Sequence, residues 1–153
     1  MNGKEPEEGK PSHELVAEDE PGRILIVTDE ERVRQVLGLM VAEEGQRPVL
    51  KDWREPDLMR TIDERFRMVV LDWGSAPMSA ARLAAAVRLS QHKTLIAVLV
   101  PCWSDLEVGA REVADFLISK PLRVTQIRRV LALACSSRSR AGGRASHVPA
   151  GMA

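Results

Sequence analysis

The sequence predicts an α/β fold in which a parallel sheet of five strands is covered by helices on both faces. Three observations lead to this fold class: short apolar runs alternate five times with helical patterns, the connections are brief, and the strongest runs are apolar at every position. Continuous apolar runs are typical of strands buried on both faces. Regular alternation produces a doubly wound sheet, and five strands suit the flavodoxin-like (βα)5 topology with strand order 2-1-3-4-5.

The predicted strands are short and rich in β-branched residues and leucine. The run Ile24–Val27 forms the centre of the first, and the third ends at Asp72. The five strands are predicted over Arg23–Thr28, Arg47–Lys51, Met68–Asp72, Thr94–Val100 and Asp115–Ile118.

Between these runs, apolar residues recur at helical spacing. Val36 belongs to the predicted apolar face of the first helix, which Gly45 closes. Met59 and Val124 are expected on the apolar faces of the second and the last helix. The helices are predicted over Glu30–Glu44, from Pro56 in a first turn, over Pro77–Leu89, over Asp105–Arg111 and from Pro121 in the first turn of the last helix.

Two segments flank the predicted domain, which covers residues 22–135. Residues 1–21 contain seven acids and two lysines, and residues 136–153 contain three arginines and no acid. Neither segment has the apolar residues to bury a core, so we expect a disordered acidic N-terminal tail and a disordered basic C-terminal tail.

Composition excludes several classes of protein. The formal net charge is zero, which gives no overall attraction to nucleic acid. No apolar run approaches the roughly 20 residues needed to span a bilayer, and the N-terminus lacks an apolar signal segment. Cys102 and Cys135 are far apart and lack metal-site spacing. We therefore expect a cytoplasmic protein with free thiols and without membrane insertion.

Charged residues follow three of the predicted strands. Asp29 comes after the first, Asp72 ends the third, and Lys120 follows the fifth. In a sheet of this order, ligands bind at the carboxyl ends of the strands. Two carboxylates there suit Mg²⁺, and a lysine beside Asp72 suits an anion placed on that carboxylate. This combination matches phosphoryl transfer to an aspartate.

These segments resemble the response-regulator receiver domains of two-component phosphorelay signalling, over about residues 22–135. The resemblance is carried by residues 24–30, 68–72 and 114–121. It implies that Asp72 is the phosphoacceptor and that Lys120 contacts the phosphoryl group. It also implies a cis peptide bond before Pro121.

The same resemblance implies a Mg²⁺ site formed by Asp29, Asp72 and the carbonyl of Gly74. The family usually has two adjacent acids after the first strand, and this chain has Thr28 at the first position, with Glu30 as a partial substitute. We therefore expect weak Mg²⁺ binding.

Two further positions depart from the family's pattern. Val100 stands where the fourth strand usually ends in Thr or Ser, and Pro101 follows it in place of a small residue. Leu117 occupies the position of the family's aromatic switch residue, with Phe116 one place early. The chain therefore resembles an atypical member.

The function predicted from these features is that of a stand-alone atypical receiver domain, not a conventional enzyme. It would act through protein–protein interaction, with phosphorylation at Asp72. A histidine kinase or another signalling protein would be its partner, and the resemblance suggests homodimerisation through the face formed by residues 103–135. The alternative is a pseudo-receiver that docks to its partner without phosphorylation. A flavodoxin-like enzyme is disfavoured because no Gly-rich phosphate loop follows the first strand.

The three tryptophans, Trp53, Trp73 and Trp103, all follow predicted strands. Partial burial at the bases of loops is the simpler interpretation. Contact with a partner is the alternative, because tryptophan is enriched at interfaces.

Overall fold

A computed structural model describes residues 21–101 and 106–136 of the chain. The sheet has five parallel strands in the order β2-β1-β3-β4-β5, which confirms the predicted fold class and topology. The strands are β1 (Arg23–Val27), β2 (Arg47–Lys51), β3 (Met68–Asp72), β4 (Leu95–Val100) and β5 (Phe116–Ser119).

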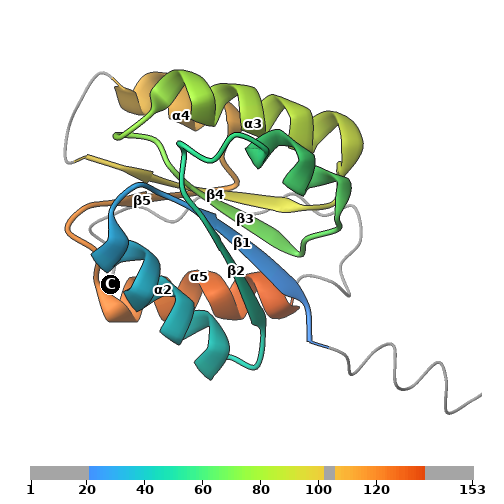
Figure 1. Cartoon of the computed structure of the whole chain (residues 1–153). Coiled ribbons are helices and arrows are strands. Elements are labelled where there is room, and N and C mark those ends of the chain that lie inside the picture. Colours follow the sequence, from blue (N-terminus) through green and yellow to red (C-terminus); the bar gives the residue numbers. More distant parts are fainter. Residues whose placement is uncertain (1–20, 102–105, 137–153) are drawn as a thin grey trace, which may run out of the picture.

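Helices cover both faces of this sheet (Figure 1). On one face lie α2 (Glu31–Glu43) and α5 (Val124–Ser136). The other face carries the 3-10 helix η2 (Leu58–Asp63), α3 (Pro77–Ser90) and α4 (Leu106–Val113).

Strands β1, β3, β4 and β5 supply side chains to both layers, because successive residues of a strand point to opposite faces. In β1, Ile24 and Ile26 pack in the cluster with α2 and α5, whereas Leu25 and Val27 pack in the cluster with α3 and α4. This two-sided burial explains the continuous apolar runs within β1, β3, β4 and β5, whereas the edge strand β2 begins and ends in the charged residues Arg47 and Lys51.

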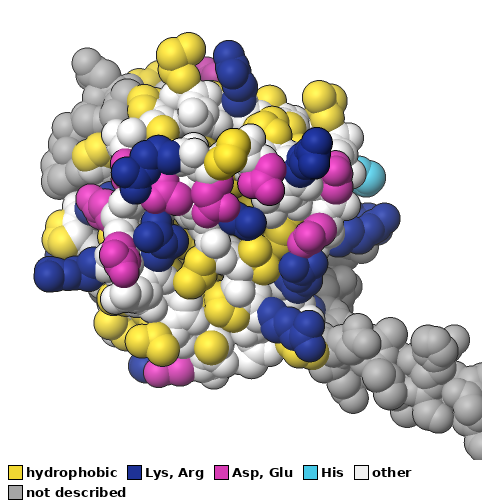
Figure 2. All heavy atoms as spheres, viewed as in Figure 1, with side chains coloured by type: hydrophobic (Ala, Val, Ile, Leu, Met, Phe, Trp, Pro, Cys, Tyr) yellow, Lys and Arg dark blue, Asp and Glu magenta, His cyan; other side chains and the backbone are white. Residues whose placement is uncertain are grey.

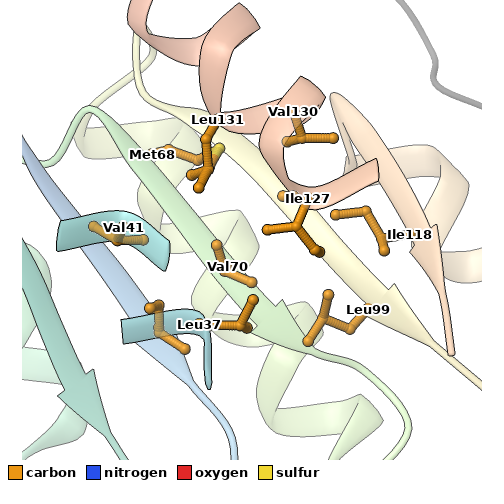
Figure 3. Close-up of a pocket in the computed structure, with 11 residues that line it drawn as sticks. Leu37, Val41, Met68, Val70, Leu99, Ile118, Ile127, Val130 and Leu131 are labelled. Atoms are coloured by element: carbon orange, nitrogen blue, oxygen red, sulfur yellow. The ribbon is translucent and has the colours of Figure 1, made fainter. Parts of the chain in front are cut away.

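The layer between the sheet and helices α2 and α5 is packed core (Figure 3). Leu37, Val70 and Ile127 are among the apolar side chains that surround a cavity of about 10 Å³ there. A space of that size is at the lower limit for one water molecule, and apolar cavities stay dry. This cavity is therefore a packing defect and not a ligand site.

Several element boundaries differ from the predictions. Strand β4 begins at Leu95, and Thr94 donates a 2.7 Å hydrogen bond from its hydroxyl to the carbonyl of Phe66. Helix α5 begins at Val124, so Pro121 precedes it and is not in its first turn. The bond between Lys120 and Pro121 is cis, as predicted.

Three residues predicted on apolar faces are exposed: Val36 (42%), Met59 (46%) and Val124 (51%). The prediction for Met59 was wrong because η2 has the tighter 3-10 geometry, in which Leu58 and Thr61 share the buried side. Val36 lies beside the buried stripe of α2, and Val124 is the first residue of α5.

Some predictions concern residues outside the described ranges. These are the two tails apart from Pro21 and Ser136, together with Cys102 and Trp103. Within the described residues, no helix is long and apolar enough to cross a membrane.

Candidate functional site

The carboxyl ends of β1, β3 and β5 meet at one edge of the sheet. Strand β1 pairs with β3, β3 with β4, and β4 with β5, all in parallel. Asp72 is the last residue of β3, Thr28 follows β1, and Lys120 follows β5. Lys120 is held beside β4 by a 2.9 Å hydrogen bond from its amide to the carbonyl of Val100. The predicted juxtaposition of Asp72 and Lys120 therefore follows from strand order.

The carboxylate of Asp72 is bound by two donors through one oxygen. The Thr28 hydroxyl donates to Asp72 Oδ2 at 2.7 Å, and the Lys120 ammonium lies 2.9 Å from the same atom. Thr28 and Asp72 are both 0% exposed. A buried carboxylate requires such partners, because an unpaired buried charge is costly.

Lys120 joins this carboxylate to a second acid. Its Nζ also lies 3.3 Å from Oε1 of Glu30. Burial acts to lower the pKa of the Lys120 ammonium, but the hydrogen bond and charge of Asp72, together with Glu30, outweigh it and raise that pKa above its usual value. Lys120 is therefore a cation at neutral pH. Glu30, a candidate substitute metal ligand, instead pairs with Lys120.

The other carboxylate oxygen, Asp72 Oδ1, is buried and has no hydrogen-bond partner within the described residues. A buried acceptor without a partner is uncommon in folded proteins. Solvent does not reach this atom, so a phosphoryl donor would reach it only after the rim of the site opened.

Thr28 is fully bonded at its position. Its hydroxyl accepts a 3.1 Å hydrogen bond from the amide of Glu30 while donating to Asp72. Its carbonyl accepts a 2.7 Å bond from Arg34, and its amide donates to the carbonyl of Lys51 at 3.2 Å. Thr28 thus does more than replace an acidic residue, because its side chain binds and orients the carboxylate of Asp72.

Asp29, by contrast, is exposed at the turn between β1 and α2 and has no hydrogen bond to Asp72 or Lys120. Its charge contributes, after Asp52, to raising the pKa of Arg54. The side-chain hydrogen bond from Arg54 in turn holds the pKa of Asp52 well below its usual range. Asp29 is also not the N-cap of α2; Glu30 is, without a side-chain cap bond.

The donor set for Mg²⁺ is therefore small. Within the described residues, no group of three His, Cys, Asp or Glu side chains could hold a metal ion. Asp72 Oδ1 is the carboxylate oxygen that lacks a partner, and Mg²⁺ keeps several waters when few protein ligands are present. The set that the resemblance implies, Asp29, Asp72 and the carbonyl of Gly74, supplies only two carboxylates and one carbonyl, so an ion bound there would keep several waters.

The loop after β3 packs tightly against the end of β4. A Cβ atom built on Gly74 would lie 2.9 Å from Cγ of Pro101, which is closer than side chains tolerate. Val100, buried at the end of β4, has no hydroxyl to offer an anion at this site. In β5, Leu117 packs in the cluster with α3 and α4, and Phe116 packs on the opposite face.

Two of the tryptophans lie in the described part of the chain. Trp73 is 5% exposed, and its amide donates to the carbonyl of Leu99 at 2.8 Å. Trp53 is half-buried. Trp53 agrees with the simpler prediction of partial burial at a loop base, whereas Trp73 is buried more completely than predicted.

No protein-family profile and no curated protein matches the sequence. Solved structures do match. A CheY-like response-regulator receiver domain protein from Methanospirillum hungatei superposes with a TM-score of 0.69 at 18% identity, over 80% of this chain and 99% of that one.

Two further receiver domains match equally broadly. The Francisella response regulator 1452 receiver domain has a TM-score of 0.64 at 16% identity, over 76% of this chain and 98% of that one. The beryllofluoride-activated NtrC4 receiver domain dimer has a TM-score of 0.65 at 21% identity, over 75% of this chain and 97% of that one. The chain has the fold of a response-regulator receiver domain.

Within this receiver fold, sequence reasoning found Asp72 and Lys120 but missed the partners that hold them. The sequence pattern predicts Thr28 as a lost metal ligand and Glu30 as its partial replacement, and it assigns no role to Arg34. No local pattern indicates these roles, since each depends on contacts between separate elements.

Proposed function

We propose that this chain is a receiver-type module of two-component signalling that acts through protein–protein interaction without phosphorylation of Asp72. The proposal rests on the buried carboxylate of Asp72. Its Oδ2 is bound by both Thr28 and Lys120, and its Oδ1 is closed to solvent. This is the pseudo-receiver alternative raised by the sequence.

Phosphoryl transfer to an aspartate needs an accessible carboxylate oxygen and cations that neutralise the developing charge. Thr28 replaces one of the acids that would hold the metal, and its hydroxyl stabilises the carboxylate in its unmodified form. Val100 provides no hydroxyl to bond a new phosphoryl oxygen. The closed oxygen of Asp72, the hydroxyl of Thr28 and the absence of a hydroxyl at Val100 all support a site that stays unphosphorylated.

The output would then be docking, in the cytoplasm, to a histidine kinase or another signalling protein. A homodimer through the face of residues 103–135 is part of the proposal, and the beryllofluoride-activated NtrC4 receiver domain is a dimer. Catalysis of a conventional enzymatic reaction is not part of it. Mg²⁺ would bind weakly through Asp29, Asp72 and the carbonyl of Gly74, supplying positive charge beside the carboxylate.

The test is labelling with acetyl phosphate and Mg²⁺, followed by intact mass measurement. We expect no phosphoryl mass on the native chain. Thr28→Asp should restore an acid at the metal site, and Asp72→Asn in that background should remove any label that appears. Stoichiometric labelling of the native chain at Asp72 would overturn the proposal.

A second candidate is the phosphorylated receiver predicted from sequence. The ion pair between Lys120 and Asp72 and the unpartnered Oδ1 favour it, because both would serve a phosphoryl group. If the native chain is labelled, this candidate holds. Val100→Thr should then strengthen the response of α5 to beryllofluoride, measured as amide chemical-shift changes.

A further inference from the structure

Helix α3 presents an unusual surface to solvent. A solvated helix face normally carries several charges, yet α3 has no acidic residue and only two basic ones, Arg82 and Arg88. Arg88 is bound to Asp115 at 2.7 Å and to two backbone carbonyls. Met78 and Leu89, by contrast, are 78% and 88% exposed.

An open groove runs between this surface and α4, with a volume of about 570 Å³. Trp73 and Pro77 line it from the loop before α3, and Ala81 and Ala85 line it from α3 itself. Figure 2 shows hydrophobic side chains projecting at the rim of the molecule over α3.

Arg82 is the one charged side chain among the residues that line the groove, all of which lie in the described part of the chain. It is exposed and has neither a hydrogen bond nor an ion pair there. An apolar groove with one unpaired cation is complementary to an apolar surface that carries one anion.

The groove is also next to Asp72. Trp73 follows Asp72 and forms part of the groove's lining. At Gly109 of α4, a Cβ atom would lie 3.5 Å from Cζ2 of the indole, so the backbone of α4 approaches the ring closely. An occupant of the groove would therefore contact the residue next to the receiver site.

We infer that the groove between α3 and α4 binds an amphipathic helix of a partner protein, whose apolar face carries one carboxylate opposite Arg82. The small side chains of Ala81 and Ala85 allow close approach of a second helix, and helix-in-groove docking uses apolar anchors of this kind. This inference names a partner surface for the function proposed above and rests on it.

A second copy of this chain fits the groove less well. Antiparallel pairing of two α3 helices would bring the two Arg82 side chains within about one helical turn of each other. Like charges in that arrangement repel. A small molecule also fits poorly, because ligand sites enclose most of a ligand's surface and this groove is open.

The test uses the full-length chain and a synthetic helical peptide of about four turns, with leucine and alanine on one face and a glutamate at its centre. A matched peptide carries lysine in place of glutamate. We expect saturable amide shifts at Ala81, Ala85 and Gly109 with the glutamate peptide. The lysine peptide should bind about fivefold more weakly, as expected for one half-exposed ion pair.

Charge reversal provides the decisive comparison. Arg82→Glu should invert the preference, so that the lysine peptide binds better, whereas Arg32→Glu on α2 makes the same charge change away from the groove and should leave the preference unaltered. The inference would be overturned if neither peptide bound saturably, or if the preference for the glutamate peptide were the same in the native chain and in Arg82→Glu. The inference would also be overturned if the native chain self-associated and Ala85→Glu abolished that self-association, since a second copy would then occupy the groove.

These outcomes are separable from those of the labelling experiment. Label on Asp72 would refute phosphorylation-independence and leave the peptide result intact. Failure of the peptide to bind, with Asp72 unlabelled, would refute the groove alone.

Discussion

The hydroxyl of Thr28 donates a 2.7 Å hydrogen bond to Oδ2 of Asp72, and both side chains are inaccessible to solvent. In the receiver pattern an acid stands at the position of Thr28, where it would repel Asp72 until a cation joined them. A hydroxyl reverses that relationship, because it stabilises the carboxylate without a cation.

Thr28→Val should destabilise the protein while preserving the shape of the side chain. A hydrogen bond to a charged group contributes about 1.5–3 kcal/mol, and the amide of Glu30 would also lose its acceptor. We expect the free energy of unfolding, measured by urea denaturation, to fall by about that amount. Thr28→Ser keeps the hydroxyl and should lose only the small contribution of one buried methyl group. Equal losses in the two variants would show that the hydrogen bond contributes little.

Thr28→Asp should make stability depend on Mg²⁺. Without the ion, two carboxylates would face each other in a buried site, and the melting temperature should fall because like charges are costly there. Mg²⁺ should raise it again, and calorimetric titration should show tighter Mg²⁺ binding than in the native chain. A native chain that binds Mg²⁺ as tightly as this variant would contradict the role given to Thr28.

Lys120→Met should be strongly destabilising. Removal of Lys120 leaves the buried carboxylate of Asp72 without a counter-charge, which costs about 3–5 kcal/mol in a fully buried pair and less here, because the Lys120 side chain is 24% exposed and Thr28 still donates to Asp72. Adding Asp72→Asn to the same chain should restore much of the loss, because the neutral amide needs no counter-charge. If the double variant is no more stable than Lys120→Met, the ion pair is not the source of the effect.

The raised pKa of Lys120 also sets a pH dependence. Since the folded state holds this proton more tightly than the unfolded state, the contribution to stability is fully present below the ordinary lysine pKa of 10.5. It is lost as pH rises through the higher pKa of the folded state. Alkaline denaturation of the native chain should therefore be steeper than that of the Lys120→Met, Asp72→Asn double variant, as measured by circular dichroism at increasing pH.

Gly74→Ala should strain the loop after β3. The new methyl group would lie 2.9 Å from the ring of Pro101, which cannot rotate away. Overpacking of this kind costs about 1–3 kcal/mol. Pro101→Ala, combined with Gly74→Ala, should recover most of the loss, whereas an equal loss in the double variant would assign the effect to the loop backbone. Thermal melts of the two single variants and the double variant provide the measurement.

Removal of residues 1–21 and 136–153 should leave the fold intact. Neither segment carries the apolar residues that a core needs. A chain of residues 22–135 should keep a cooperative thermal melt near that of the full-length chain. A midpoint lower by many degrees would show that a tail packs on the domain.

The sequence by itself determined the architecture of this protein. Two-sided burial makes the runs within β1, β3, β4 and β5 continuously apolar. All five strands could be located within one or two residues, and their alternation with helices implied the parallel order. That order also predicted that Asp72 and Lys120 would meet, because the carboxyl ends of parallel strands share one edge of the sheet.

Only the tertiary structure decided how the side chains at that edge are used. Thr28 and Asp72 are 44 residues apart, Lys120 and Asp72 are 48 apart, and Lys120 and Glu30 are 90 apart. Hydrophobic periodicity reports which face a residue occupies, but not its rotamer or its partner. The pairing of Thr28 with Asp72 and the closure of Asp72 Oδ1 depend on contacts between elements that are distant in sequence, and so only the folded chain shows them.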